Sequence, residues 1–235
     1  MTQPKIPAHV APLFSILEVL FEEQEKAFSS QNPESVKYRD ILETLALNRW
    51  NCLTTQEMVE IKQEWGGNRT IDFERRAGSK ILFLPPLELE PGFFPVMWMN
   101  CDGKTYCTTI RIIMLKHKGA DIRPPDKVYW GFNFRIESPH TFCPGINQGI
   151  RHEFYHTQLS KNFGLGGAEF YDTIDWLPNK QPSFPLLATD PITMVFTLIL
   201  TLYGKKYFLD IIGKLHDKHL NGLPHVKIFM ECINQ

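Results

Sequence analysis

Val-Met-Trp-Met-Asn-Cys-Asp-Gly, residues 96–103, decides the fold together with the run 105–115 that follows it. Both runs are apolar and rich in residues that favour β-strands. Asp102-Gly103 between them is a typical turn signal for two antiparallel strands. The sequence therefore predicts a β-hairpin at the centre of the chain.

Two further strands are predicted beside this hairpin. The run 79–84 ends at Pro85-Pro86, because proline has no N–H to donate to a strand ladder. The run 128–136 alternates, with aromatic and aliphatic residues on one face. The connections between these runs are too short for crossover helices. We therefore expect a largely antiparallel sheet of at least four strands.

The N-terminal part of the chain has a helical pattern. Apolar residues recur at helical spacing over residues 12–28, and a second helix follows the break at Asn32-Pro33. Thr54 and Glu57 form a capping box at the start of a third helix, which Gly66-Gly67 ends. This unit serves either for packing or for docking a partner.

The C-terminal part is also helical, which makes the fold class α+β. Asp190-Pro191 begins a helix that is apolar on all sides up to Gly204 and belongs in a core or against a partner. A further helix is predicted over 206–219, and 226–230 fits either a strand or a short helix. The predicted division is a helical unit, residues 1–68, and an α+β main domain, residues 69–235, or one continuous domain.

Composition favours a cytoplasmic protein. The net charge is −1, so no overall field attracts nucleic acid or an anionic membrane. The N-terminus lacks the apolar core of a signal peptide, and the apolar run 191–203 is too short to span a bilayer. The five cysteines are odd in number and include no C-x-x-C pair. This argues against a disulfide framework and against a cysteine zinc site.

The sharpest motif is His152-Glu153-Phe154-Tyr155-His156, which fits H-E-x-x-H. On a helix over 150–163, His152 and His156 would share a face and bind Zn²⁺, with Glu153 as the general base. A third ligand would come from Glu169, Asp172 or Asp175. Glu169 and Asp172 share a face if their segment is helical. Over about 25 residues this resembles the zincin metallopeptidases, which implies a zinc-dependent hydrolase.

Other features of the motif leave two alternatives open. Gln158 stands where the zincin pattern usually has a hydrophobic residue, and the longer metzincin form is absent. The histidines can instead be hydrogen-bonded members of a packed turn. They can also belong to a ligand site without turnover, whose remaining members would be Arg135, Glu137, His140, Tyr155 and Gln158.

A second resemblance involves residues 134–139, residues 152–159 and the stretch from 184 through the apolar helix to Gly204. Over residues 125–205 the chain resembles uncharacterised bacterial proteins found beside phage-defence genes. The resemblance implies an accessory or adaptor component of a multi-protein system that works with another protein subunit. We therefore predict a non-catalytic accessory protein, which could also bind zinc. The alternative prediction is a zinc-dependent hydrolase.

Overall fold

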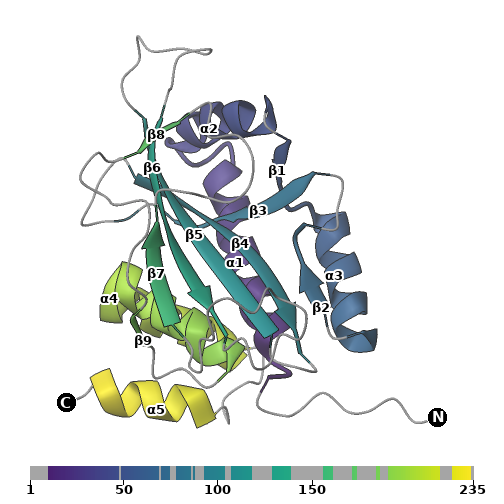
Figure 1. Cartoon of the computed structure of the whole chain (residues 1–235), viewed down its shortest axis with the longest axis vertical. Coiled ribbons are helices and arrows are strands. Elements are labelled where there is room, and N and C mark those ends of the chain that lie inside the picture. The colour runs from purple at the N-terminus through teal and green to yellow at the C-terminus, as the bar shows by residue number, and fades with distance from the viewer. Residues whose placement is uncertain are drawn as a thin grey trace, which may run out of the picture.

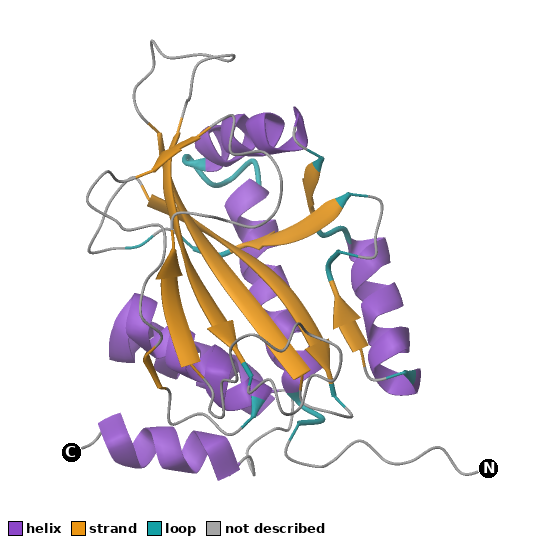
Figure 2. Cartoon of the chain, viewed as in Figure 1, coloured by secondary structure: helices purple, strands orange, loops and turns teal. Residues whose placement is uncertain are grey.

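The computed structural model of the 235-residue chain shows a central β-sheet surrounded by helices (Figures 1 and 2). It describes residues 10–47, 49–68, 70–74, 78–85, 87, 93–103, 107–117, 129–138, 156–160, 171–173, 184–185, 190–217 and 224–233.

The centre of the sheet is formed by three long antiparallel strands. They are β4 (Phe93–Asp102), β5 (Cys107–His117) and β6 (Tyr129–Glu137). Asp102 pairs with Cys107 at the hairpin end, as the turn signal predicts. Among the described residues the sheet has nine strands, and most of its pairings are antiparallel. The predicted α+β class is confirmed.

Shorter strands complete the sheet. β3 (Ser79–Phe83) pairs with β4 and ends before Pro85, as predicted. The sequence patterns did not identify the remaining short strands, and two of these pairings are parallel, β1 with β3 and β8 with β6. These strands are β1 (Trp50–Cys52), β2 (Thr70–Asp72), β7 (His156–Ser160), β8 (Tyr171–Thr173) and β9 (Phe184–Pro185).

Three helices lie in the N-terminal part of the chain, close to their predicted bounds, with β1 between the second and the third. They are α1 (Leu13–Phe28), α2 (Ser35–Leu47) and α3 (Thr55–Gly67). The capping box is confirmed: the Glu57 backbone N–H donates to the Thr54 hydroxyl, and the Glu57 carboxylate accepts from the Thr54 backbone N–H.

The two faces of the sheet bury different side chains. Met97 and Ile112 belong to a core cluster that includes residues of α1 and α4, both of which lie behind the sheet in Figure 1. Val96 and Ile113, one position away, pack instead with Tyr38 of α2. This alternation follows from the two-residue period of a strand. One end of the second face is thus covered by α2.

The buried Gln24 ties α1 to the backbone beside the sheet. Its amide nitrogen donates to the Leu53 carbonyl at 3.0 Å, and its oxygen accepts from the Phe83 N–H at 3.0 Å. The large core cluster also includes both α1 and sheet residues. The proposed division at residue 68 stays a prediction.

The apolar C-terminal helix α4 (Pro191–Asp217) contributes part of its surface to the core. By length and composition, Pro191–Leu215 could cross a membrane. Many of its apolar side chains, such as Phe196 and Phe208, are instead fully buried against the rest of the chain. Gly204 has a positive φ of 73°, a conformation that favours glycine, and it interrupts the helix where the sequence predicts an end.

The terminal helix α5 (Pro224–Ile233) resolves the strand-or-helix alternative for residues 226–230. Phe229 of α5 packs against Phe196 and Phe208 of α4, with ring centres 5.6 and 5.5 Å apart. The burial of α4 is consistent with a soluble protein, whereas the cytoplasmic location stays a prediction.

The cysteine prediction needs a correction. Cys107 is disulfide-bonded, while Cys52 and Cys101 are free thiols. An odd number of cysteines argues against a framework in which every cysteine is paired, but it leaves room for a single bond. Because disulfides persist mainly in oxidising compartments, cysteine usage no longer supports the cytoplasmic prediction.

Candidate functional site

Neighbouring strands place polar and aromatic residues in a row across the second face of the sheet. Arg111 on β5 is directly opposite both Trp98 on β4 and Arg135 on β6. Gln158 on β7 pairs with Arg135 on the other side. Directly opposed residues of antiparallel strands share a face. The register therefore brings Trp98, Arg111 and Arg135 together.

Arg111 is held against an aromatic ring. Its guanidinium carbon lies 5.3 Å from the centre of the Trp98 ring, in a favourable cation–π arrangement. Burial lowers the pKa of Arg111 and the charge of Arg135 lowers it further, while Glu137 acts in the opposite direction. Arginine remains protonated in proteins even so. Two positive charges thus lie side by side on this face.

Glu137 brings Arg135 and His156 to one carboxylate oxygen. Its Oε2 accepts a hydrogen bond from Arg135 Nη2 at 2.6 Å and lies 3.6 Å from His156 Nε2. Burial acts to raise the pKa of Glu137, but the nearby His156 and the charge of Arg135 outweigh it and hold that pKa below its ordinary value. Glu137 is therefore ionised at neutral pH and positions both partners.

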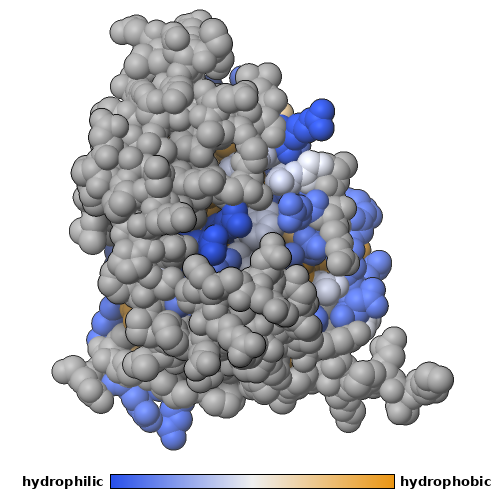
Figure 3. All heavy atoms as spheres, viewed as in Figure 1, coloured by the Kyte–Doolittle hydropathy of each residue, from blue (hydrophilic) through white to orange (hydrophobic). Residues whose placement is uncertain are grey.

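Arg135 keeps donors for a further group. A guanidinium carries five N–H bonds, and within the described part of the chain Nε of Arg135 has no hydrogen-bond partner. The same is true of the indole Nε1 of Trp98. The Arg135 side chain is 35% exposed, and Figure 3 shows a strongly hydrophilic patch in the middle of this face. The arrangement can bind a carboxylate or phosphate group.

The metal hypothesis requires a helix over residues 150–163, but residues 156–160 form β7. His156 begins this strand and pairs with Glu137 of β6. The free edge of β6 offers long-range backbone hydrogen bonds that override the local helical pattern. His152 and Glu153 lie outside the described residues, so their position relative to His156 stays a prediction.

Of the three candidates for the third zinc ligand, the structure describes only Asp172. Asp172 lies in β8 and pairs with Trp130, whereas His156 pairs with Glu137. Trp130 and Glu137 are seven residues apart along β6, which separates the two pairings by about 23 Å. Asp172 and His156 therefore do not meet around one metal ion.

Other parts of the predicted sites lie outside the described residues, namely Glu169, His140 and Tyr155. Within the part that the structure describes, no three His, Cys, Asp or Glu side chains are grouped so that they could hold a metal ion. The zinc site stays a prediction. Of the predicted ligand-site residues, the structure brings Arg135, Glu137 and His156 together.

Two members of the site, Arg111 and Trp98, were not predicted from the sequence. Arg111 is the single charged residue in the run 105–115. A lone arginine inside an otherwise apolar strand requires a polar environment on one face. That signal could have identified Arg111 as a member of the site. Its partners on the neighbouring strands depend on the register of strand pairing, which the local sequence pattern does not define.

Comparisons of the chain with protein-family models, with curated proteins and with solved structures gave no match. The resemblances to zincins and to defence-associated bacterial proteins therefore stay predictions. The functional interpretation rests on the geometry of the Arg111–Arg135 face.

Proposed function

We propose that this protein is a non-catalytic accessory or adaptor protein that recognises an acidic group of a partner protein through Arg111 and Arg135. The observation that supports this is the direct opposition of the two arginines on β5 and β6. Like charges directly opposite each other destabilise a sheet. Glu137 already offsets part of this repulsion, and a bound carboxylate could accept a further hydrogen bond from Arg135, whose Nε has no partner among the described residues.

The surroundings of the pair suit recognition more than turnover. Trp98 packs against Arg111, so this side chain loses little freedom on binding. The overall charge of −1 does not favour a long polyanion such as nucleic acid. A short acidic segment of another protein subunit carries the carboxylates that a guanidinium group binds. Membership of a bacterial antiviral system is part of the proposal and rests only on the resemblance described above.

A peptide-binding measurement tests the proposal. A fluorescently labelled oligoglutamate peptide is titrated with the protein, and its anisotropy is followed at low salt. We expect binding that weakens about tenfold or more in Arg135→Gln, because a hydrogen bond to a charged group contributes roughly 1.5–3 kcal/mol. Arg39→Gln on the exposed surface of α2 is the matched control and should bind as the wild type does.

Two results would overturn the proposal. One is equal binding of the peptide by the wild type and by Arg135→Gln, which would move recognition away from this face. The other is tighter binding of a single-stranded DNA oligonucleotide than of the peptide, which would make nucleic acid the better partner. The alternative of a zinc-dependent hydrolase at His152, Glu153 and His156 stays a prediction and is tested separately by metal analysis.

A further inference from the structure

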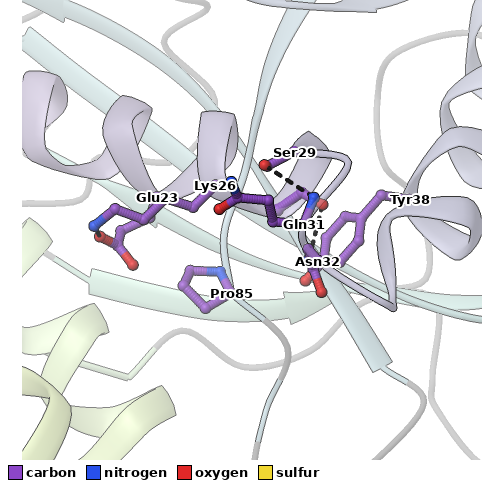
Figure 4. A pocket seen from close by; sticks show the side chains of 8 residues that line it. Glu23, Lys26, Ser29, Gln31, Asn32, Tyr38 and Pro85 are labelled. Atoms are coloured by element: carbon purple, nitrogen blue, oxygen red, sulfur yellow. Dashed lines mark hydrogen bonds and ion pairs between the residues drawn. The ribbon is translucent and has the colours of Figure 1, made fainter.

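A pocket of about 400 Å³ lies where the end of α1 meets the connection to α2. Its lining includes Glu23, Lys26, Gln31, Asn32, Tyr38 and Pro85 (Figure 4). Small-molecule sites typically have volumes of roughly 300–1,000 Å³. The pocket is therefore large enough for a small metabolite.

Two tyrosine hydroxyls, one in the pocket lining and one near it, are buried without a partner among the described residues. Tyr38 is 0% exposed, and its hydroxyl has no hydrogen-bond partner among the described residues. The hydroxyl of Tyr207 on α4 is in the same situation. Tyr203, whose ring centre lies 4.6 Å from that of Tyr207, instead donates to the Pro85 carbonyl at 2.8 Å. A buried hydroxyl without a partner destabilises the fold.

The three tyrosines belong to one neighbourhood, although they come from distant parts of the chain. Burial raises the pKa of Tyr207, and the nearby Glu23 and Tyr38 raise it further. Figure 4 shows Tyr38 extending from α2 toward Asn32 and Pro85. Tyr38 thus lines the pocket with a hydroxyl that has no partner among the described residues, and Tyr207 lies nearby.

The charges around the pocket are already paired. Oε1 of Glu23 lies 2.8 Å from Lys26 Nζ and 3.0 Å from Lys214 Nζ. Lys214 also pairs with Asp210. Gln31, like the remaining side chains that line the pocket, is uncharged. An ion would therefore find little net charge here, whereas a molecule with several hydroxyl groups could donate to and accept from the tyrosines.

We infer that this pocket binds a neutral, polyhydroxylated small molecule that hydrogen-bonds to Tyr38. The inference is independent of the proposed function, because the pocket shares no residue with the Arg111–Arg135 face. It predicts that a change at Tyr38 has different effects on ligand binding and on stability. Removing the Tyr38 hydroxyl abolishes binding without destabilising the free protein, because that hydroxyl has no partner to lose.

The test uses the full chain with three probes, D-glucose, D-ribose and myo-inositol, each at about 10 mM, which would nearly saturate a millimolar site. Binding is read by saturation-transfer NMR, and the melting temperature of the free protein is measured in parallel. We expect a signal from at least one probe and its loss in Tyr38→Phe, whose melting temperature should equal or exceed that of the wild type.

Tyr203→Phe is the matched control, because it removes a hydroxyl that has a partner. Its melting temperature should fall by about 2–4 °C, the shift typical of losing one hydrogen bond in a domain of this size. The inference is overturned if none of the three probes gives a signal. It is also overturned if Tyr38→Phe retains the signal, or if it lowers the melting temperature as much as Tyr203→Phe does.

Discussion

Replacing Glu137 with glutamine should destabilise the protein and at the same time strengthen its binding of an acidic peptide. The Glu137 carboxylate accepts a 2.6 Å hydrogen bond from Arg135. Glutamine can still accept such a bond, but a neutral one, and the difference is roughly 1–2 kcal/mol. Because the Arg135 side chain is 35% exposed, solvent screening favours the lower end, about 1 kcal/mol.

The pH dependence of this loss has a defined sign. The pKa of Glu137 in the folded protein lies below its ordinary value of 4.5. The ionised carboxylate therefore stabilises the fold above about pH 4.5, and this contribution disappears as the pH falls through the lowered pKa. The wild type and Glu137→Gln should differ in stability at neutral pH and converge in acid.

Urea unfolding followed by tryptophan fluorescence measures this difference across the pH range. Glu34→Gln is the matched control, because Glu34 also makes a 2.6 Å ion pair, with Lys37, but on an exposed surface. It should change stability by less than about 0.5 kcal/mol. Equal losses in the two variants, or a Glu137→Gln loss that is the same in acid and at neutral pH, would refute the reasoning. So would weaker peptide binding by Glu137→Gln, since that variant lacks the carboxylate that competes for Arg135.

Three further outcomes follow from the structure. Gln24→Met should lower the free energy of unfolding in urea by about 2–5 kcal/mol, because it leaves two buried backbone groups without partners, whereas Gln56→Met on the exposed face of α3 should change it by less than about 0.5 kcal/mol. Cys101, whose pKa burial raises to about 12, should resist iodoacetamide at about pH 8 in the native protein and react once the protein is unfolded, as mass spectrometry of its peptide would show. Elemental analysis of the purified protein should give far less than one zinc per chain, and a stoichiometric amount would favour the His152 and His156 site over the adaptor.

The elements that the sequence predicts well are those with strong local signals. The capping box of Thr54 and Glu57, the hairpin turn at Asp102 and the start of α4 at Pro191 each depend on residues close together in the chain. Such signals act through the backbone conformation of a few residues. They survive in the fold because tertiary packing supports the same local structure.

The elements that the sequence predicts poorly depend on distant partners. β7 and β8 are short strands that pair along one edge of β6, one antiparallel and one parallel. Nothing in residues 156–160 indicates that their pairing partner ends at Glu137. The H-E-x-x-H spacing places both histidines on one face only if the segment forms a helix. From His156 onward the segment instead pairs with β6.

The two proposed sites have one physical feature in common, and it argues for binding in both. At the sheet face, Nε of Arg135 and Nε1 of Trp98 are buried without hydrogen-bond partners within the described part of the chain. In the pocket lining, the same holds for the hydroxyl of Tyr38, and nearby for that of Tyr207. Most buried polar groups in proteins are satisfied, and each exception weakens the fold. Such groups gather at two places, the sheet face with its arginines and the neutral pocket. Two ligands of different chemistry, each supplying the missing hydrogen-bond partners, best explain them.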